Sequence, residues 1–189
     1  MTIAPGTLSD AQIKSLAARI DRPIVLVGMM GVGKTSVGRK LAQLLSLPFA
    51  DADEAIEEAA QMSVSEIFER FGEEYFRDGE RRVIARLVAE GPKVIATGGG
   101  AFVQEETRSL VLERGIAVWL DSDVQTLVER VKRKDNRPLL RGGDPAEIVA
   151  RLKREREPFY AQAPIQVLSE SGPHGETLRR ILEAIDQWL

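Results

Sequence analysis

The chain has 189 residues, of which 43% are hydrophobic and 29% are charged, and its formal net charge is −3 at pH 7. This length suits a single domain with a sizeable core, and the slightly acidic balance excludes a general electrostatic attraction to nucleic acid or to anionic membranes. The sequence has no cysteine, which excludes disulfides and thiolate metal sites. No apolar run is long enough to cross a bilayer and no secretory signal is recognisable, so we expect a cytoplasmic protein.

Residues 1–22 are expected to form an accessory helical extension ahead of the first strand. Ser9 and Gln12 have the spacing of a capping box. An apolar stripe at helical spacing follows, formed by Ile13, Leu16, Ala17 and Ile20. The stripe indicates a helix that packs on the domain, and no side chain in this segment suggests a chemical role.

The next stretch carries the most specific motif of the chain. Residues 28–35 read G-M-M-G-V-G-K-T and match the phosphate-loop pattern G-x-x-x-x-G-K-[S/T] at every fixed position. An apolar run at 23–27 predicts a strand before the motif, and helical spacing over 34–45 predicts a helix after it. In such a loop, backbone N–H groups bind phosphate oxygens, Lys34 reaches the β- and γ-phosphates, and Thr35 binds Mg²⁺. The flanking elements argue against a simple glycine turn.

Two aspartates follow the second predicted strand, at about 47–50. Ligands of open α/β sheets collect beyond the carboxyl ends of the strands, where Asp51 and Asp53 would lie. One carboxylate could support Mg²⁺ through water while the other accepts a hydroxyl proton. The alternative is that Asp53 only caps the next helix, and the phosphate loop upstream favours the functional interpretation.

Helical patterns continue without a strand from 53 to 89. A capping box at 63–66 and a stop at Gly72 indicate successive helices, which exceed a simple crossover and predict a small inserted lobe. Arg77 and Glu80 lie about one turn apart in the last of these helices. Spacing alone does not separate a functional pair from the solvated face of a helix.

A third strand is expected at 93–96, and Gly98, Gly99 and Gly100 follow it. Consecutive glycines cost backbone entropy, so they favour close approach of the backbone to a ligand, with a flexible turn as the alternative. A helix at 105–114 and a fourth strand at 116–120 continue the alternation.

Ser122 and Gln125 are expected to cap the next helix, and a polar loop follows at 134–143. Basic residues gather at the end of this helix and in the loop: Arg130, Lys132, Arg133, Lys134, Arg137 and Arg141. They could form a solvated face, a nucleic-acid patch or a lid over phosphates. The lack of interleaved aromatic residues argues against binding of single-stranded nucleic acid.

The last part of the chain predicts a helix that begins after Asp144 and ends before Pro158, a strand at 165–168 and a helix at 177–189. His174 is the only histidine, which argues against a histidine-based triad or metal site. Short apolar strands that alternate with helices predict an α/β fold with a parallel sheet covered on both faces.

Taken in this order, the motifs resemble those of the shikimate kinase family from about residue 23 to 189. The matching segments are G-M-M-G-V-G-K-T at Gly28, F-A-D-A-D at Phe49, E-E-Y-F-R-D-G-E at Glu73, A-T-G-G-G at Ala96, N-R-P-L-L at Asn136 and R-E-P-F-Y at Arg156. The resemblance implies a three-layer α/β/α P-loop kinase fold in a single domain over 23–189. Its parallel sheet would have five strands in the order 2-3-1-4-5, with a substrate lobe over 53–89 and a lid over 134–143.

The resemblance also implies the reaction, which is transfer of the γ-phosphoryl group of ATP to the 3-hydroxyl of shikimate in aromatic amino-acid biosynthesis. It implies catalytic roles for Lys34, Asp53 and Arg137, and a magnesium site at Thr35 with Asp51 acting through water. The implied ATP-binding residues are Gly31, Val32, Gly33, Lys34, Thr35, Ser36, Arg130 and Arg137. The implied shikimate-binding residues are Asp53, Arg77, Gly98, Gly99, Gly100 and Arg156, with the two arginines gripping the carboxylate.

The chain departs from the family in its N-terminal extension and in the adenine-side segment near 170–174, which does not match. The nearest alternative functions are those of a gluconate kinase or a nucleoside monophosphate kinase with the same core. A nucleotide-binding regulator without small-molecule turnover is an alternative of a different class, against which the Asp51 and Asp53 pair argues. We expect a monomer that binds shikimate and neither nucleic acid nor a membrane.

Overall fold

The computed structural model describes residues 8–132, 143–169 and 174–189. Its centre is a five-stranded parallel sheet of order β2-β3-β1-β4-β5, which confirms the predicted topology. The strands are β1 (Ile24–Val27), β2 (Phe49–Asp51), β3 (Val94–Ala96), β4 (Ile116–Asp121) and β5 (Ile165–Leu168). Within this sheet, β1 pairs with β3 on one side and with β4 on the other, so the strand before the phosphate loop occupies the middle.

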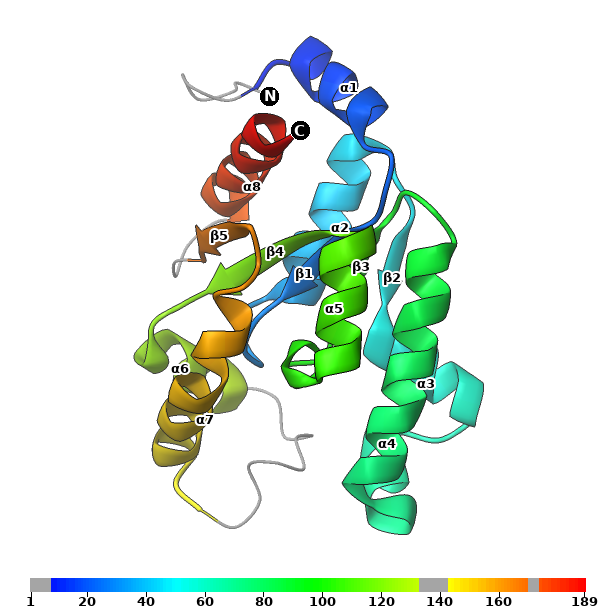
Figure 1. The fold of residues 1–189 in the computed structure, drawn as a ribbon. Helices are drawn as coiled ribbons and strands as arrows, with labels where there is room; N and C mark the ends of the chain where they lie inside the picture. Colours follow the sequence, from blue (N-terminus) through cyan, green and yellow to red (C-terminus); the bar gives the residue numbers. More distant parts are fainter. Residues whose placement is uncertain (1–7, 133–142, 170–173) are drawn as a thin grey trace.

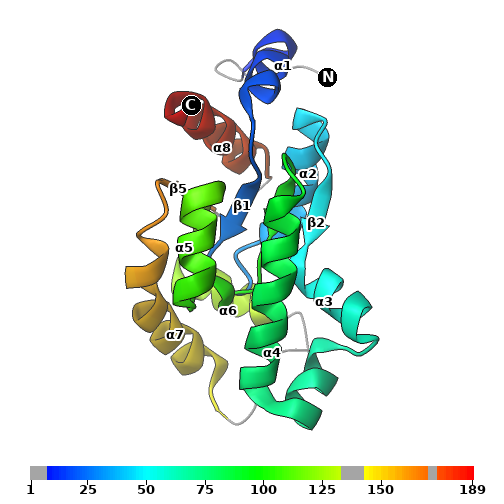
Figure 2. The same ribbon diagram turned by 45° about the vertical axis from the view of Figure 1, so that its right-hand side comes forward.

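Helices cover both faces of the sheet, with α2 and α8 on one face and α4 and α5 on the other (Figures 1 and 2). The helices are α1 (Asp10–Arg19), α2 (Lys34–Leu45), α3 (Ala52–Ala60), α4 (Val64–Ala89), α5 (Glu105–Arg114), α6 (Val124–Lys132), α7 (Pro145–Tyr160) and α8 (His174–Trp188), with a short 3₁₀ turn η1 (Ala101–Val103). Because the sheet is covered on both sides, all four residues of β1 are fully buried. No helix in the described ranges is long and apolar enough to span a membrane.

The carboxyl ends of the strands lie at one edge of the sheet, where α3, the start of α4, α6 and α7 gather (Figure 1). The opposite edge carries α1 and the C-terminal end of α8. This arrangement places every segment that follows a strand, including the phosphate loop and the glycine run after β3, on the same side of the molecule.

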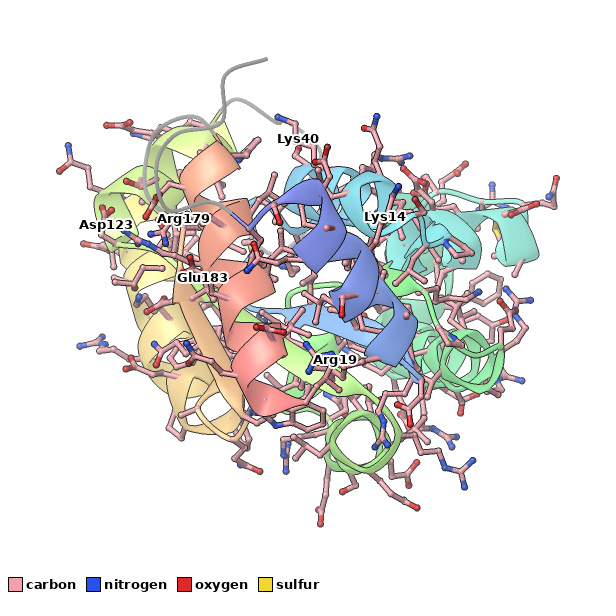
Figure 3. All side chains as sticks on the ribbon, turned by 90° about the horizontal axis from the view of Figure 1, so that it is seen from above. Lys14, Arg19, Lys40, Asp123, Arg179 and Glu183 are labelled. Carbon is pink, nitrogen blue, oxygen red and sulfur yellow. The ribbon has the colours of Figure 1, made fainter. Side chains whose placement is uncertain are left out.

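Helix α1 forms as the capping box predicts. The Ser9 side chain accepts a hydrogen bond from the Gln12 N–H, and the Gln12 side chain accepts one from the Ser9 N–H at 2.8 Å. Ile13 and Leu16 are buried, and α1 packs against α2. Arg19 forms an ion pair with Asp186 of α8, so α1 lies over the neighbouring ends of both helices (Figure 3). Whether residues 1–22 act as a separate unit stays a prediction.

Two predicted helix ends are wrong. Helix α6 is capped by Asp123, whose carboxylate accepts from the Thr126 N–H at 2.8 Å and from the Thr126 hydroxyl at 2.7 Å, and not by Ser122 with Gln125. Helix α7 does not end before Pro158 but runs to Tyr160. Proline removes only one hydrogen bond there, and the burial of Tyr160 against Trp119, with ring centroids 6.0 Å apart, holds the last turn in place.

The predicted break at Gly72 is confirmed, because this residue has φ 81° and ψ 176° inside α4 and divides it into two helical segments. Helix α3 packs against α4, as an inserted lobe requires, although the division of the chain at 53–89 remains an expectation. The predicted lid at 134–143 lies outside the described residues except for Gly143, and so does Arg137.

Candidate active site

The phosphate loop joins β1 to α2 and lies against β4 and α6. Gly28 and Gly31 have φ of 134° and 81°, values that favour glycine. A Cβ atom on Gly28 would collide with the Leu120 carbonyl oxygen, and one on Gly31 would lie 2.8 Å from Val131 Cγ2. The close approach of the neighbouring elements therefore requires glycine at both positions, which explains the motif in terms of packing as well as turn geometry.

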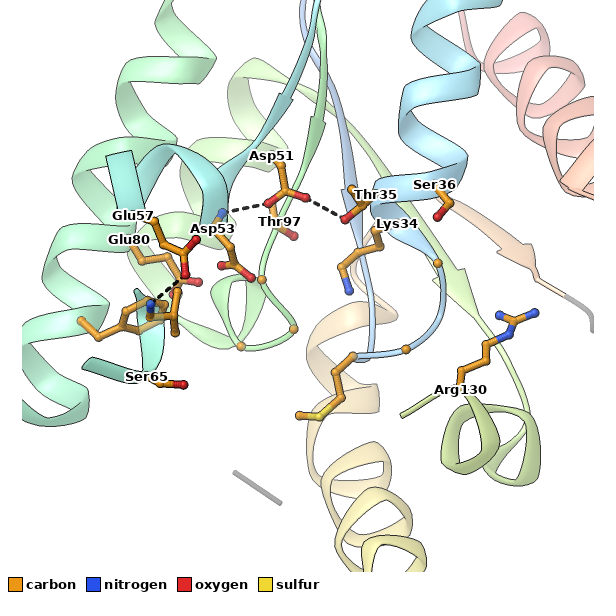
Figure 4. A pocket seen from close by; sticks show the side chains of 18 of the residues that line it. Lys34, Thr35, Ser36, Asp51, Asp53, Glu57, Ser65, Glu80, Thr97 and Arg130 are labelled. Atoms are coloured by element: carbon orange, nitrogen blue, oxygen red, sulfur yellow. Dashed lines mark hydrogen bonds between the residues drawn. The ribbon is translucent and has the colours of Figure 1, made fainter. Parts of the chain in front are cut away.

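Lys34 is the first residue of α2 and is only 8% exposed. Its ammonium donates hydrogen bonds to the carbonyl oxygens of Gly28 at 2.7 Å and Met29 at 2.9 Å. These contacts hold the charge over the loop, beside the N-terminus of α2, where phosphate oxygens bind in loops of this kind (Figure 4).

Asp51 connects the phosphate loop to α3. The Thr35 hydroxyl donates to Asp51 Oδ2 at 2.7 Å, while Asp51 Oδ1 accepts from the N–H groups of Asp53 at 3.0 Å and Glu54 at 3.4 Å (Figure 4). The N-cap of α3 is therefore Asp51, and the interpretation of Asp53 as only a helix cap is wrong. Since Asp51 does the capping, the carboxylate of Asp53 is left to face the cavity.

Asp53 lies in a position that disfavours its charged form. Burial, followed by the negative charge of Asp51, raises the pKa of Asp53 above its ordinary value, and the Lys34 ammonium opposes the shift. Its Oδ1 atom is buried and has no hydrogen-bond partner among the described residues. An unsatisfied buried oxygen of this kind is costly unless a ligand supplies the missing donor.

Arg77 and Glu80 form a buried ion pair, with 2.6 Å between Arg77 Nη1 and Glu80 Oε2 and side-chain exposures of 13% and 1%. The solvated-face interpretation of this pair is therefore wrong. Burial raises the pKa of Glu80, and the positive charge of Arg77 partly offsets this shift. Glu80 was not singled out as a site residue from the sequence, although its spacing from Arg77 was visible.

The glycine run after β3 leaves room for these side chains. A Cβ atom on Gly98 would lie 2.7 Å from Glu80 Oε1 and 3.0 Å from Asp53 Oδ1. A Cβ atom on Gly100 would collide with the Arg77 guanidinium. The two carboxylates and the guanidinium thus pack directly on the backbone, which supports the close-approach interpretation over that of a flexible turn.

Helix α7 contributes Arg156 and Tyr160 from the R-E-P-F-Y segment. Arg156 is 9% exposed, and its Nη1 atom has no hydrogen-bond partner in the described part of the chain. The Tyr160 hydroxyl donates to the Gly99 carbonyl oxygen and lies 3.9 Å from Met29 Sδ. Burial raises the pKa of Tyr160 to about 12, so the hydroxyl stays protonated and keeps donating. No local sequence pattern distinguishes Tyr160 from a core aromatic residue.

Removal of the Tyr160 hydroxyl should disturb the glycine run after β3. In Tyr160→Phe the Gly99 carbonyl oxygen loses its buried donor, which costs about 1–3 kcal/mol, and the glycine run shifts. Of the two substrates that the family resemblance implies, we expect the KM for shikimate to rise at least about fivefold while the KM for ATP changes little. Steady-state kinetics with Tyr75→Phe as the control, a change at a half-exposed tyrosine of α4, would check this. Equal effects on both substrates would contradict it.

One cavity of about 580 Å³ is lined by Lys34, Thr35, Asp51, Asp53, Arg77, Glu80, the glycine run and Arg156, whereas Tyr160 lies behind Gly99. Asp53 and Glu80 lie on one side of Lys34, and Arg130 of α6 lies on the other (Figure 4). Arg130 Nη1 donates to the Val32 carbonyl oxygen at 3.1 Å and is thereby anchored to the loop. Within the described ranges, no group of three or more histidine, cysteine or acidic side chains could hold a metal ion by itself.

A parallel sheet of this order, a phosphate loop after its central strand and a buried cluster of acids and arginines across the same cavity define the class of P-loop kinases of small molecules. The phosphate loop and this cluster line the same cavity. A small acceptor that carries hydroxyl and carboxylate groups would satisfy the orphaned polar atoms of the cluster.

Comparisons with known proteins identify the family within this class. The family model for shikimate kinase matches residues 30–186. The shikimate kinase of Novosphingobium aromaticivorans is 67% identical over 186 residues, which cover 96% of each chain. A solved structure of the shikimate kinase of Acinetobacter baumannii in complex with shikimate superposes with a TM-score of 0.81 at 34% identity and covers 95% of this chain and 96% of that one. The chain belongs to the shikimate kinase family, and it is a phosphotransferase that acts as a shikimate kinase.

A gluconokinase from Sinorhizobium meliloti also has a similar structure, with a TM-score of 0.60 at 17% identity over 90% of this chain. At that identity the likeness extends to the fold alone. The alternative function of a gluconate kinase is therefore less well supported than that of a shikimate kinase.

Proposed function

We propose that this chain transfers the γ-phosphoryl group of ATP to the 3-hydroxyl of shikimate with the residues that line the cavity beside the phosphate loop. The observation that carries this proposal is that the phosphate loop and the cluster of Asp53, Arg77, Glu80 and Arg156 line the same space of about 580 Å³. Phosphoryl transfer depends on positioning and charge neutralisation rather than on covalent chemistry, and a shared cavity supplies both.

Asp53 is proposed to accept the proton of the attacking hydroxyl. Its buried Oδ1 lacks a partner among the described residues, and a hydroxyl group placed there would supply one. Burial raises the pKa of Asp53, which makes the carboxylate a stronger base than an exposed aspartate. On the other side of the transferred group, Lys34 neutralises the charge of the β- and γ-phosphates.

Arg77 and Arg156 are proposed to hold the carboxylate of shikimate. The planar guanidinium suits a planar carboxylate, and Arg156 Nη1 and Arg77 Nε are buried donors without partners in the described ranges. Glu80 is proposed to orient Arg77 through their 2.6 Å ion pair. Arg137 is proposed to bind the phosphates of ATP, the role that the resemblance implies.

Thr35 and Asp51 fit a magnesium ion that arrives with ATP, because Mg²⁺ prefers oxygen ligands and keeps several waters. The Thr35 hydroxyl, 2.7 Å from Asp51 Oδ2, would bind the ion, and Asp51 would hold one of its waters. When bound, the ion would neutralise negative charge on the β- and γ-phosphates.

We further propose that the protein is a monomer, which sedimentation analysis would test.

Arg156→Ala should weaken shikimate binding and leave ATP binding almost unchanged. The variant loses charge-assisted hydrogen bonds in a buried site, which corresponds to about 2–4 kcal/mol, or roughly 30-fold to 800-fold in Kd. Arg156 gives a cleaner test than Arg77, whose removal would also leave Glu80 buried without its cation. Calorimetric titration would measure both ligands, with Arg151→Ala on the exposed side of α7 as the control. Unchanged shikimate affinity would rule out the proposed role.

The position of the new phosphate tests the proposed reaction directly. With MgATP and shikimate, phosphorus–proton coupling in the NMR spectrum of the product should assign a single phosphate ester to carbon 3. A mixture of esters, or phosphate on another hydroxyl, would show that Asp53 does not select the 3-hydroxyl.

A further inference from the structure

His174 is the one imidazole of the chain, and none of the roles above uses it. It is the first residue of α8 and lines the same cavity as the phosphate loop, together with Ser36 and Arg130. Helix α8 packs beside α2, whose Lys40 lies one turn beyond Ser36 (Figure 3). A titratable side chain in the wall of the catalytic cavity needs an explanation, because a purely structural residue would not have to face that space.

The part of the cavity around His174 is where the phosphates of ATP nearest the nucleoside should lie. The γ-phosphoryl group must point toward Asp53, so the phosphates extend along Lys34 and the N-terminus of α2 toward Ser36. Arg130 lies beyond this point, on the side of Lys34 away from Glu80 (Figure 4). His174 belongs to this end, because α8 packs beside α2 and its first residue lines the cavity with Ser36 and Arg130.

The backbone at this end is firmly held. The Val32 carbonyl oxygen accepts from Arg130 Nη1 at 3.1 Å and from the buried Ser169 hydroxyl at 3.1 Å. The phosphate loop is thereby tied to α6 and to the residue that follows β5, so these elements hold the loop in place at the end of the cavity that His174 lines.

The charges around His174 are positive from both elements that face it. Burial lowers the pKa of His174 below its ordinary value, and the ammonium of Lys40 on α2 and the guanidinium of Arg130 on α6 lower it further. On α8 itself, the nearest acidic residue, Glu176, is bound by Arg179 and Arg180. The free protein therefore holds a neutral imidazole beside cations at neutral pH.

We propose that His174 takes up a proton when the nucleotide phosphates bind, so that the ATP affinity of this enzyme depends on the protonation of its single histidine. A bound polyanion reverses the local field, because it neutralises the cations and attracts an imidazolium. Linkage makes the effect reciprocal: protonation of His174 strengthens ATP binding by the same factor by which ATP favours the proton. This inference rests on the proposed function for the placement of ATP.

The proposal fixes the direction in which ATP affinity changes with pH. Nucleotide binding raises the pKa of His174, so between its free and bound values ATP binding weakens as pH rises. Each unit of difference between the two values corresponds to about a tenfold change in Kd. Below the free value the imidazole is charged in both states, and above the bound value it is neutral in both, so the dependence disappears.

The test uses the native protein, because a single histidine gives one Cε1–H resonance. Its pH titration should be recorded free, with saturating MgADP and with saturating shikimate. We expect MgADP to raise the midpoint by about one unit and shikimate alone to leave it in place. Coincident curves, in a sample where calorimetry shows MgADP bound, would overturn the inference alone. Failure of MgADP to bind at all would overturn the proposed function with it.

His174→Gln provides the second measurement. The variant keeps a polar side chain but does not titrate, whereas the phosphates of ATP titrate alike with both proteins. The ratio of the MgATP Kd at about pH 8 to that at about pH 6 should be up to tenfold larger for the native chain than for the variant. Equal ratios would show that His174 is not linked to nucleotide binding.

Discussion

Lys34→Ala is expected to reduce kcat by about a hundredfold to a thousandfold, the loss seen when one preorganised charge-stabilising donor is removed. The ammonium is buried and fixed by the carbonyl oxygens of Gly28 and Met29, so it is in place before the negative charge on the transferred group develops. Rapid-quench measurement of a single turnover would separate this loss from an effect on ADP release.

In Lys34→Ala the carbonyl oxygens of Gly28 and Met29 also lose their donor, so the variant would lower the stability of the loop as well as remove the charge. Lys34→Met keeps most of the side-chain volume and removes only the charge, so it should lose activity to a similar extent. Lys14→Ala, at an exposed lysine of α1, is the control for a general loss of positive charge. Near-normal turnover by the methionine variant, with unchanged thermal unfolding, would exclude Lys34 from the chemistry.

Asp53→Asn is expected to lower kcat by more than about a hundredfold, because the amide is similar in size but cannot accept the hydroxyl proton. Capping of α3 depends on Asp51, so the substitution should not unfold the helix. Glu54→Gln, one residue further along the exposed side of α3, provides a matched loss of negative charge and should retain activity. Full activity of Asp53→Asn would mean that another group accepts the proton.

The pH profile gives this prediction a second readout. Burial raises the pKa of Asp53, so the basic carboxylate forms at a higher pH than for an exposed aspartate. The kcat/KM for shikimate should therefore fall as pH drops through that raised value and reach a plateau above it. Residual activity of Asp53→Asn should lack this acidic limb, whereas the limb should persist in Glu54→Gln.

The parts of the site that could be predicted from the sequence are those set by local pattern. The residues of the phosphate loop are contiguous in the sequence. The strand before it and the helix after it form where the hydrophobic pattern predicts them. The strand order followed from the family resemblance, and the sheet confirms it. The break at Gly72 was also visible, since one glycine in a helical pattern is a local signal.

Which of the two neighbouring aspartates caps α3 could not be predicted, because it depends on contacts across the fold. Asp51 and Asp53 are both able to cap a helix. Asp51 caps α3 in the structure, and it also accepts a hydrogen bond from Thr35 on α2. The burial of Arg77 and Glu80 likewise results from packing of α4 on the glycine run, which helical spacing alone does not contain. Tertiary packing also overrode the proline signal at Pro158.

The most direct test of the central claim is ADP release from MgATP with shikimate, gluconate and AMP offered separately as acceptors. We expect rapid release with shikimate, release near background with the other two, and loss of the shikimate-dependent signal in Arg156→Ala at low shikimate. Turnover with gluconate or AMP that equals or exceeds turnover with shikimate would contradict it, because the cavity would then select a different acceptor.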